Sequence, residues 1–172
     1  QLPLLCPRRD CQRVFIAYYR ESDGGSAVLE SVSRGARKVV DFSEIINEIS
    51  PSFIKIYQQA YIAEQDELFE ICGVGYRKAL EFLVKDYAIQ NHTSEKEKIE
   101  KTQLGPCIKD YINDERVKSV AKRATWLGND ETHYVRRWEG KNLADLKALI
   151  RLTIHWLEME AETKRFEQEM PE

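Results

Sequence analysis

The chain lacks the sequence segments that mark membrane proteins and secreted proteins. No run of apolar residues approaches the roughly 20 that a helix needs to cross a bilayer, so we expect no membrane partner. The first residues lack the apolar stretch of a secretory signal peptide, and we expect a cytoplasmic protein. Because the chain opens with Gln1, we also expect it to be a processed or excised part of a longer protein.

Catalytic signatures with a defined spacing are missing as well. The chain contains no Walker phosphate loop, no nucleophile elbow and no H-E-x-x-H zinc motif. The formal net charge of -3 argues against nucleic-acid binding driven by total charge, although it leaves room for a local basic patch.

What is present predicts a mainly α-helical protein with a small β-rich N-terminal extension. The 172 residues, 42% hydrophobic and 32% charged, suit one globular domain with an appendage. Within residues 1–45, R-V-F-I-A-Y-Y-R (residues 13–20) is dense in aromatic and β-branched residues and predicts a strand. D-G-G (residues 23–25) predicts a turn, and residues 26–33 and 37–41 are weaker strand candidates.

From residue 46 to residue 172 we expect a bundle of four to five helices. Ser50-Pro51 is a helix start, with a hydroxyl cap and a proline in the first turn. An apolar face with helical spacing runs from Leu68 to Tyr87, and Gly73 and Gly75 within it either break the helix or let another helix pack closely. Gly105-Pro106 is an expected break, and Asn142 is a candidate cap for the last helix.

The four cysteines fall into two groups. Cys72 and Cys107 lie in helical patterns and are expected to be buried thiols in a reducing compartment. Cys6 and Cys11, in L-C-P-R-R-D-C, suit half of a tetrahedral zinc site, and a bound structural zinc would need a second pair of ligands upstream. A plain turn with two free thiols, or a local disulfide, is the alternative.

Arg77 and Glu81 lie four residues apart on one helical face, where their side chains can pair. The pair is either a surface salt bridge of small energetic value, or an arginine that a carboxylate aims at a phosphate or a partner.

The strongest candidate site is W-L-G-N-D-E-T-H, residues 126–133. Gly128 and Asn129 can adopt a left-handed conformation and end a helix, and in that structural interpretation His133 is half buried and bonded to a carboxylate. In the functional interpretation His133 is a general acid or base for attack of a 2′-hydroxyl on a phosphodiester, and Asn129 orients it or holds a phosphate oxygen. Asp130 is a further candidate for contact with a ligand.

The flanks of this motif favour a polyanion. Basic residues among aromatic ones suit backbone contact and base stacking, and the alternative is an ordinary charged helix face with tryptophan in the core. The residues concerned are Arg116, Lys118, Lys122, Arg123, Trp126, Tyr134, Arg136, Arg137 and Trp138.

Three strings resemble the bacterial domain-of-unknown-function family 4145, over roughly residues 45–160: S-P-S-F-I-K-I-Y-Q-Q-A, G-V-G-Y-R-K-A-L-E-F-L-V-K-D-Y and W-L-G-N-D-E-T-H. That family is similar to the HEPN (higher eukaryotes and prokaryotes nucleotide-binding) superfamily, helical bundles common in toxins, RNases and phage-defence systems. Some members of the family carry cysteine pairs before the helical domain, which agrees with C-P-R-R-D-C as half of a split zinc ribbon.

The resemblance implies a HEPN-like homodimer whose polar motifs face each other and bind RNA or a nucleotide. The RNase motif of the superfamily is an arginine, often followed by asparagine, with a histidine a few residues on. Asn129 and His133 match the last two, but Gly128 stands at the arginine position. Arg77 or Arg123 would have to stabilise the phosphate in its place.

We therefore expect an RNA- or nucleotide-binding domain, whose RNase chemistry would need no cofactor. The alternative is a non-catalytic dimerisation or protein-interaction module.

Overall fold

The computed structural model describes residues 1–9, 11–22, 24–33 and 37–171, and the chain folds as two compact units, residues 1–39 and 40–172. The sequence predicts this boundary after residue 45, whereas the two units of the structure meet after residue 39. Residues 40–45 belong to the helical unit because Phe42 packs edge-on against Phe53 and Tyr57, with ring centroids 5.1 and 5.2 Å apart.

The first unit is a three-stranded antiparallel sheet in the order β1 (Leu2–Leu5), β2 (Val14–Glu21) and β3 (Ala27–Val32). The expected strands at 13–20 and 26–33 are confirmed as β2 and β3. Gly25 has a φ of 73°, which agrees with the expected turn at 23–25, whereas Asp23 lies outside the described residues. The expected strand at 37–41 is wrong, because these residues are not extended in any sheet, and β1 was not anticipated.

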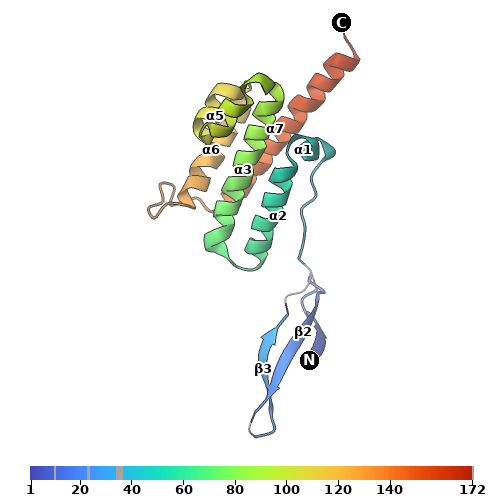
Figure 1. The fold of residues 1–172 in the computed structure, drawn as a ribbon. Helices are drawn as coiled ribbons and strands as arrows, with labels where there is room; N and C mark the ends of the chain where they lie inside the picture. The colour runs from blue at the N-terminus through green and yellow to red at the C-terminus, as the bar shows by residue number, and fades with distance from the viewer. Residues whose placement is uncertain (10, 23, 34–36, 172) are drawn as a thin grey trace. The chain divides into compact units, whose positions relative to one another are not determined.

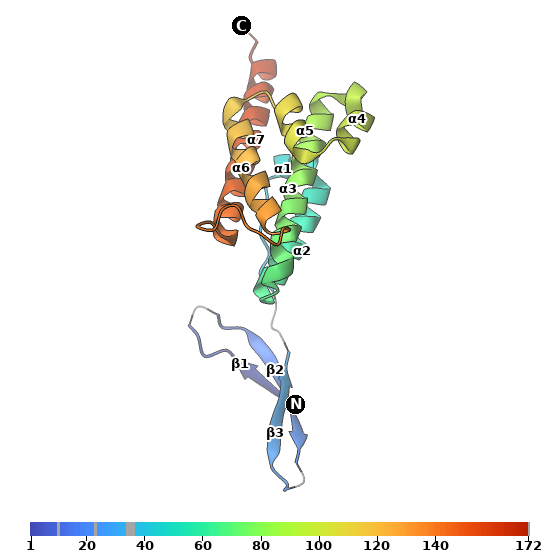
Figure 2. The ribbon, with the colours of Figure 1, turned by 90° about the vertical axis from the view of Figure 1, so that its left-hand side faces the viewer.

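The second unit contains seven α-helices within the described residues: α1 (Glu44–Ile49), α2 (Pro51–Gln65), α3 (Phe69–Asn91), α4 (Lys96–Lys101), α5 (Leu104–Tyr111), α6 (Glu115–Asp130) and α7 (Leu143–Glu169). A short 3-10 helix, η1 (Thr93–Glu95), precedes α4. The four long helices α2, α3, α6 and α7 run side by side in alternating directions, as Figures 1 and 2 show. The prediction of a mainly helical protein with a small N-terminal sheet is therefore confirmed.

The helix starts follow local chemistry. Ser50 caps α2 by accepting the backbone N–H of Phe53 at 3.1 Å, and its own hydroxyl donates to Asp86 on α3. Asn142 and Asp145 form a reciprocal capping box at the start of α7, as the sequence predicts for Asn142. The expected break at Gly105-Pro106 is wrong: both residues lie in the first turn of α5, where proline is tolerated.

Two glycines allow α3 to pack closely on its neighbours. Helix α3 is continuous through Gly73 and Gly75, so the helix-breaking alternative is wrong. A Cβ atom on Gly75 would lie 2.8 Å from the Cβ of Ala60 on α2, and one on Gly73 would lie 2.8 Å from the Cβ of Glu131 beyond α6. These contacts bring α2 and the end of α6 against the same half of α3.

The core lies between the long helices. Cys72 and Cys107 are fully buried in it, as expected, whereas Leu68 and Ile71 at the start of the predicted apolar face are exposed. Lys147 on α7 pairs with Glu64 on α2 at 2.8 Å, and the hydroxyl of Tyr76 on α3 donates to the same carboxylate. Among the helices that the structure describes, none is long and apolar enough to pass through a bilayer.

Candidate functional site

The residues of the 126–133 motif lie at one end of the bundle, where α6 ends, α7 begins and α2 turns into α3 (Figure 1). Helix α6 continues through Gly128 and Asn129 to Asp130, and neither residue has a positive φ. The expected left-handed helix end is therefore wrong. The carbonyl of Asn129 instead accepts the backbone N–H groups of Thr132 at 2.9 Å and of His133 at 3.1 Å, which satisfies the helix end with right-handed turns.

Arg77 reaches this motif from α3. Its Nε donates to Oδ1 of Asn129 at 3.1 Å, and its Nη1 pairs with Glu81 at 2.8 Å. A Cβ atom on Gly128 would lie 2.8 Å from the Cβ and 2.6 Å from the Cδ of Arg77. The aliphatic stem of Arg77 thus occupies the space that a side chain at position 128 would need.

Glu81 is shared between two cations. Lys85 contacts its second carboxylate oxygen at 2.8 Å, so Glu81 lies between Arg77 and Lys85 along α3. Burial opposes the charged form of Glu81, but the hydrogen bonds from Lys85 and Arg77 outweigh it, and the pKa of this carboxyl lies below its ordinary value. Glu81 therefore stays ionised and orients the Arg77 guanidinium, of which three N–H groups remain without a described partner.

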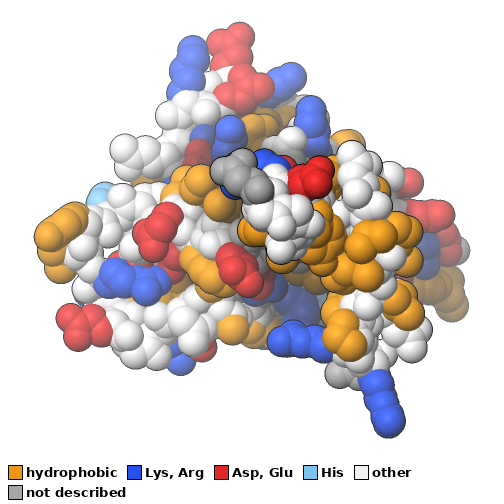
Figure 3. Space-filling view, turned by 90° about the horizontal axis from the view of Figure 1, so that it is seen from below, with side chains coloured by type: hydrophobic (Ala, Val, Ile, Leu, Met, Phe, Trp, Pro, Cys, Tyr) orange, Lys and Arg blue, Asp and Glu red, His pale blue; other side chains and the backbone are white. Residues whose placement is uncertain are grey.

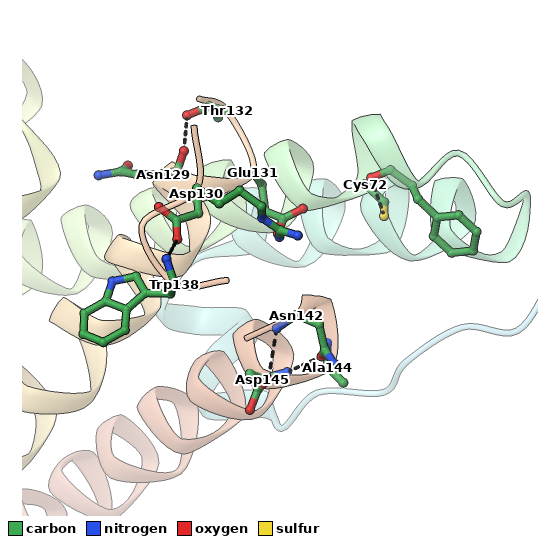
Figure 4. A network of polar contacts seen from close by, with 11 residues as sticks. Cys72, Asn129, Asp130, Glu131, Thr132, Trp138, Asn142, Ala144 and Asp145 are labelled. Atoms are coloured by element: carbon green, nitrogen blue, oxygen red, sulfur yellow. Dashed lines mark hydrogen bonds and ion pairs between the residues drawn. The ribbon is translucent and has the colours of Figure 1, made fainter. Parts of the chain in front are cut away.

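Consecutive side chains at the end of α6 point in different directions (Figure 4). Asp130 is buried, and its Oδ2 accepts the backbone N–H of Trp138 at 2.8 Å. Glu131 lies against Gly73 and forms an ion pair with Arg136. These two carboxylates fold the loop that joins α6 and α7 back onto the bundle.

His133 is exposed, and its ring has no hydrogen-bond partner among the described residues. The structural interpretation of a half-buried histidine bonded to a carboxylate is therefore wrong. The ring lines a cavity of about 480 Å³ together with Arg136, Tyr134 and Phe69. His133 and Arg136 thus line one cavity. Arg77 on α3 and Asn129 on α6 are not among the residues that line it.

Arg123 and Trp126 lie elsewhere on α6, in a second hollow that also contains Trp138. Trp126 is 40% exposed and Trp138 39%, so the interpretation that places tryptophan in the core is wrong for this pair. Arg123 donates to the backbone carbonyl of Ser119 at 2.9 Å, one turn earlier in α6. Arg123 is thus separate from the His133 cavity.

The expected basic flank is partly neutralised. Arg116 pairs with Asp114 and Lys118 with Glu115, both within the first turn of α6. Figure 3 shows acidic and basic side chains interspersed on the face that it draws. In the described part of the chain no carboxylate pairs with Lys122, Arg123 or Arg137, so any anion binding by this region depends on a few local cations.

Cys6 and Cys11 face each other across the turn between β1 and β2. The backbone N–H of Cys6 bonds to the carbonyl of Arg13 at 2.8 Å, and that of Cys11 bonds to Arg8 at 3.0 Å. A hydrogen bond with the backbone of Arg13, and a second one with the Cys6 thiol, lower the pKa of the Cys11 thiol. No third histidine, cysteine or carboxylate joins them among the residues that the structure describes.

Some residues of the site have no signal in the sequence pattern. Phe69, Glu70 and Leu143 line the His133 cavity because the α2–α3 connection and the start of α7 meet α6 there. Lys85 could have been found, since it lies four residues after Glu81 on the same helical face. Comparison of the chain with known protein families, curated proteins and solved structures gave no match.

Proposed function

We propose that the helical unit is a HEPN-like domain that binds RNA or a nucleotide in the cavity lined by His133 and Arg136. The observation that carries this proposal is the open imidazole: His133 is exposed and shares its cavity with Arg136. Glu131, which pairs with Arg136, and the carboxylates of Glu70 and Asp130 line the same cavity, so a bound phosphate must take the place of Glu131 at the guanidinium. A histidine whose ring is not used to hold its own loop is available to contact a ligand and to act as a general base.

The position of Arg77 supports the resemblance to the HEPN motif at Gly128, where this sequence lacks the arginine of that motif. Gly128 stands where the HEPN motif has arginine, and the stem of Arg77 lies over Gly128 while its guanidinium contacts Asn129. Arg77 is therefore a better substitute than Arg123, which lies in another hollow. The same contact fixes the Asn129 side chain beside the loop that carries His133.

In the catalytic form of the proposal, His133 removes the proton of a ribose 2′-hydroxyl. The 2′ oxygen then bonds to phosphorus, the bond from phosphorus to the 5′ oxygen breaks, and the leaving oxygen takes up a proton. Arg136, once the phosphate takes the place of Glu131, would stabilise the charge on the phosphate oxygens, and Arg77 would hold Asn129 in position. The reaction leaves a 2′,3′-cyclic phosphate and a 5′-hydroxyl end.

The test is cleavage and binding of single-stranded RNA by the wild type and by His133→Ala, with His155→Ala as the matched control. His155 is an exposed histidine on α7, far along the chain from the loop. We expect His133→Ala to abolish cleavage at an unchanged melting temperature, with His155→Ala as active as the wild type. Equal cleavage by all three proteins would remove His133 from the mechanism, and RNA binding without any cleavage would leave a binding domain.

A second candidate function is a non-catalytic dimerisation module, and exposed apolar residues beside the cavity favour it. They gather at the start of α3 and in the loop after α6: Leu68, Phe69, Ile71, Val74, Tyr134 and Val135. Phe69 and Tyr134 line the same cavity, so the two groups are neighbours. If a second copy covers this surface, Ile71→Glu will lower the molar mass measured by light scattering to that of the monomer, and Val39→Glu, at an exposed position outside the surface, will not.

We also propose that Cys6 and Cys11 supply two ligands of a structural zinc ion, whose other ligands come from a partner or from another part of a longer protein. Two adjacent thiols, one with a lowered pKa, suit a metal that binds thiolates. Ala17 is the one buried apolar residue among those described in residues 1–39, so a metal would supply stability that the sheet lacks. When that partner or the longer protein supplies the other ligands, we expect zinc in the purified sample, lost in Cys11→Ser and retained in Cys107→Ser; equal metal content in both variants would contradict the proposal.

A further inference from the structure

A second hollow lies between α6, α7 and the loop that joins them. It measures about 310 Å³, and its floor is apolar, formed by Leu127, Ala148 and Leu149. The indole rings of Trp126 and Trp138 form its wall. Two of the three tryptophans of the chain are therefore partly exposed at one concave site.

The two indoles form one stacked aromatic pair. Their ring centroids are 5.9 Å apart and their planes differ by 13°, so they stack on each other. The buried carboxylate of Asp130 holds the backbone of Trp138, and Figure 4 shows the Trp138 indole directed away from that contact. The indole pair is therefore held in place before any ligand arrives, which lowers the entropic cost of binding.

The rim of the hollow carries two cations and one carboxylate. Arg123 uses Nη1 for Ser119, and its Nε and Nη2 have no described partner. Lys141 lies 3.2 Å from Asp145, whose other oxygen accepts the backbone N–H of Asn142 at 3.0 Å. The rim has a net charge of one positive unit, with its carboxylate already engaged by donors.

We propose that this hollow binds one nucleotide, with the base against the indole pair and the phosphate at Arg123 and Lys141. An aromatic wall selects a planar ring of any base, because every base has a π face, and the cations select a ligand that also carries a negative charge. The inference rests on the proposed function for its ligand class but uses a different site. Asp130 lines the His133 cavity and also holds the backbone of Trp138, which lines the hollow. An RNA strand that occupies both the cavity and the hollow would pass over the hydrogen bond between Asp130 and Trp138.

The test uses tryptophan fluorescence in a Trp156→Phe background, where Trp126 and Trp138 are the remaining tryptophans. AMP should quench the emission saturably, whereas ribose 5-phosphate and inorganic phosphate, which lack a base, should not. A single-stranded oligoadenylate distinguishes the two sources of the ligand: quenching at much lower concentration than AMP indicates a residue of an RNA strand, and equal quenching per nucleotide indicates a free nucleotide.

Variants then separate this site from the His133 cavity. By calorimetry, Trp138→Leu should weaken AMP binding about tenfold or more, and Arg123→Gln, a rim change that disturbs no packing, should weaken it severalfold with a reduced dependence on salt. His155→Ala, which lies in neither site, should leave AMP binding unchanged. Quenching of Trp126 and Trp138 reports this hollow, so loss of RNA cleavage in His133→Ala bears on the proposed function and not on the hollow. No quenching by AMP or oligoadenylate, or an unchanged dissociation constant in Arg123→Gln and Trp138→Leu, would overturn the inference.

Discussion

Arg77 on α3 donates a hydrogen bond from its Nε to Oδ1 of Asn129 on α6, at 3.1 Å, and the two residues are 52 positions apart in the chain. The contact depends on the glycine beside Asn129, because the stem of Arg77 lies where a side chain at position 128 would be. Arg77 and Gly128 therefore form a matched pair: one helix lacks a side chain so that the other can bring its guanidinium to the motif.

Gly128→Ala should destabilise the protein. The added methyl group would meet Arg77 at less than 3 Å, and overpacking of this kind costs about 1–3 kcal/mol of unfolding free energy. Gly105→Ala is the matched control, since a Cβ atom there meets nothing within 4 Å. Chemical denaturation of both variants measures the difference, and equal stability of the two would contradict the close approach of α3 and α6.

Arg77→Ala and Asn129→Ala should act on the same interaction. A hydrogen bond that involves a charged group contributes about 1.5–3 kcal/mol, and each single change removes it. The unfolding free energy lost in the double variant should be smaller than the sum of the losses in the two single variants, because both changes remove the same hydrogen bond. A double-mutant cycle measures this difference. Strict additivity would mean that the contact contributes nothing to stability.

Asp130→Ala should free the loop between α6 and α7. The buried carboxylate accepts the Trp138 N–H in a partly buried hydrogen bond, and a hydrogen bond to a charged group contributes about 1.5–3 kcal/mol. Asp130→Asn keeps an oxygen at this position and should lose less. Hydrogen exchange at the Trp138 amide reports the effect directly, and an amide as protected in Asp130→Ala as in the wild type would be inconsistent with this role.

Stability should fall in acid through the N-cap of α6. The hydrogen bonds from the Arg116 guanidinium and from the backbone N–H groups of Arg116 and Val117 lower the pKa of Asp114 from 3.8 to about 2. Because the folded pKa lies below the ordinary one, the stabilisation is complete above about pH 4 and is lost as the pH falls through 2.

Asp114→Asn separates this titration from capping itself, because asparagine still caps a helix but has no carboxyl proton. We expect the wild type to melt at a higher temperature than Asp114→Asn at neutral pH, and the difference to shrink between pH 4 and pH 2. A difference that is independent of pH would show that the Asp114 carboxylate is not stabilised in the folded state.

Local chemistry explains which parts of the fold the sequence predicts well. Ser50-Pro51 and Asn142 are caps that act through the nearest three residues, and the structure uses both as predicted. The strand at residues 37–41 fails for the opposite reason: its β-branched residues have strand propensity, but Val40 and Phe42 pack against the helical unit instead. The left-handed helix end at Gly128 fails because the glycine serves a contact with another helix.

The sequence by itself determined the mainly helical fold class, the starts of α2 and α7 and the residue types at the candidate site, since these follow from spacing and from interactions within a few residues. Tertiary structure alone decided that Arg77 meets Asn129, that His133 stands open beside Arg136, and that Trp126 and Trp138 stack at the surface. Each of these relationships joins separate elements, and their distance depends on how α3, α6 and α7 pack, which no local pattern encodes.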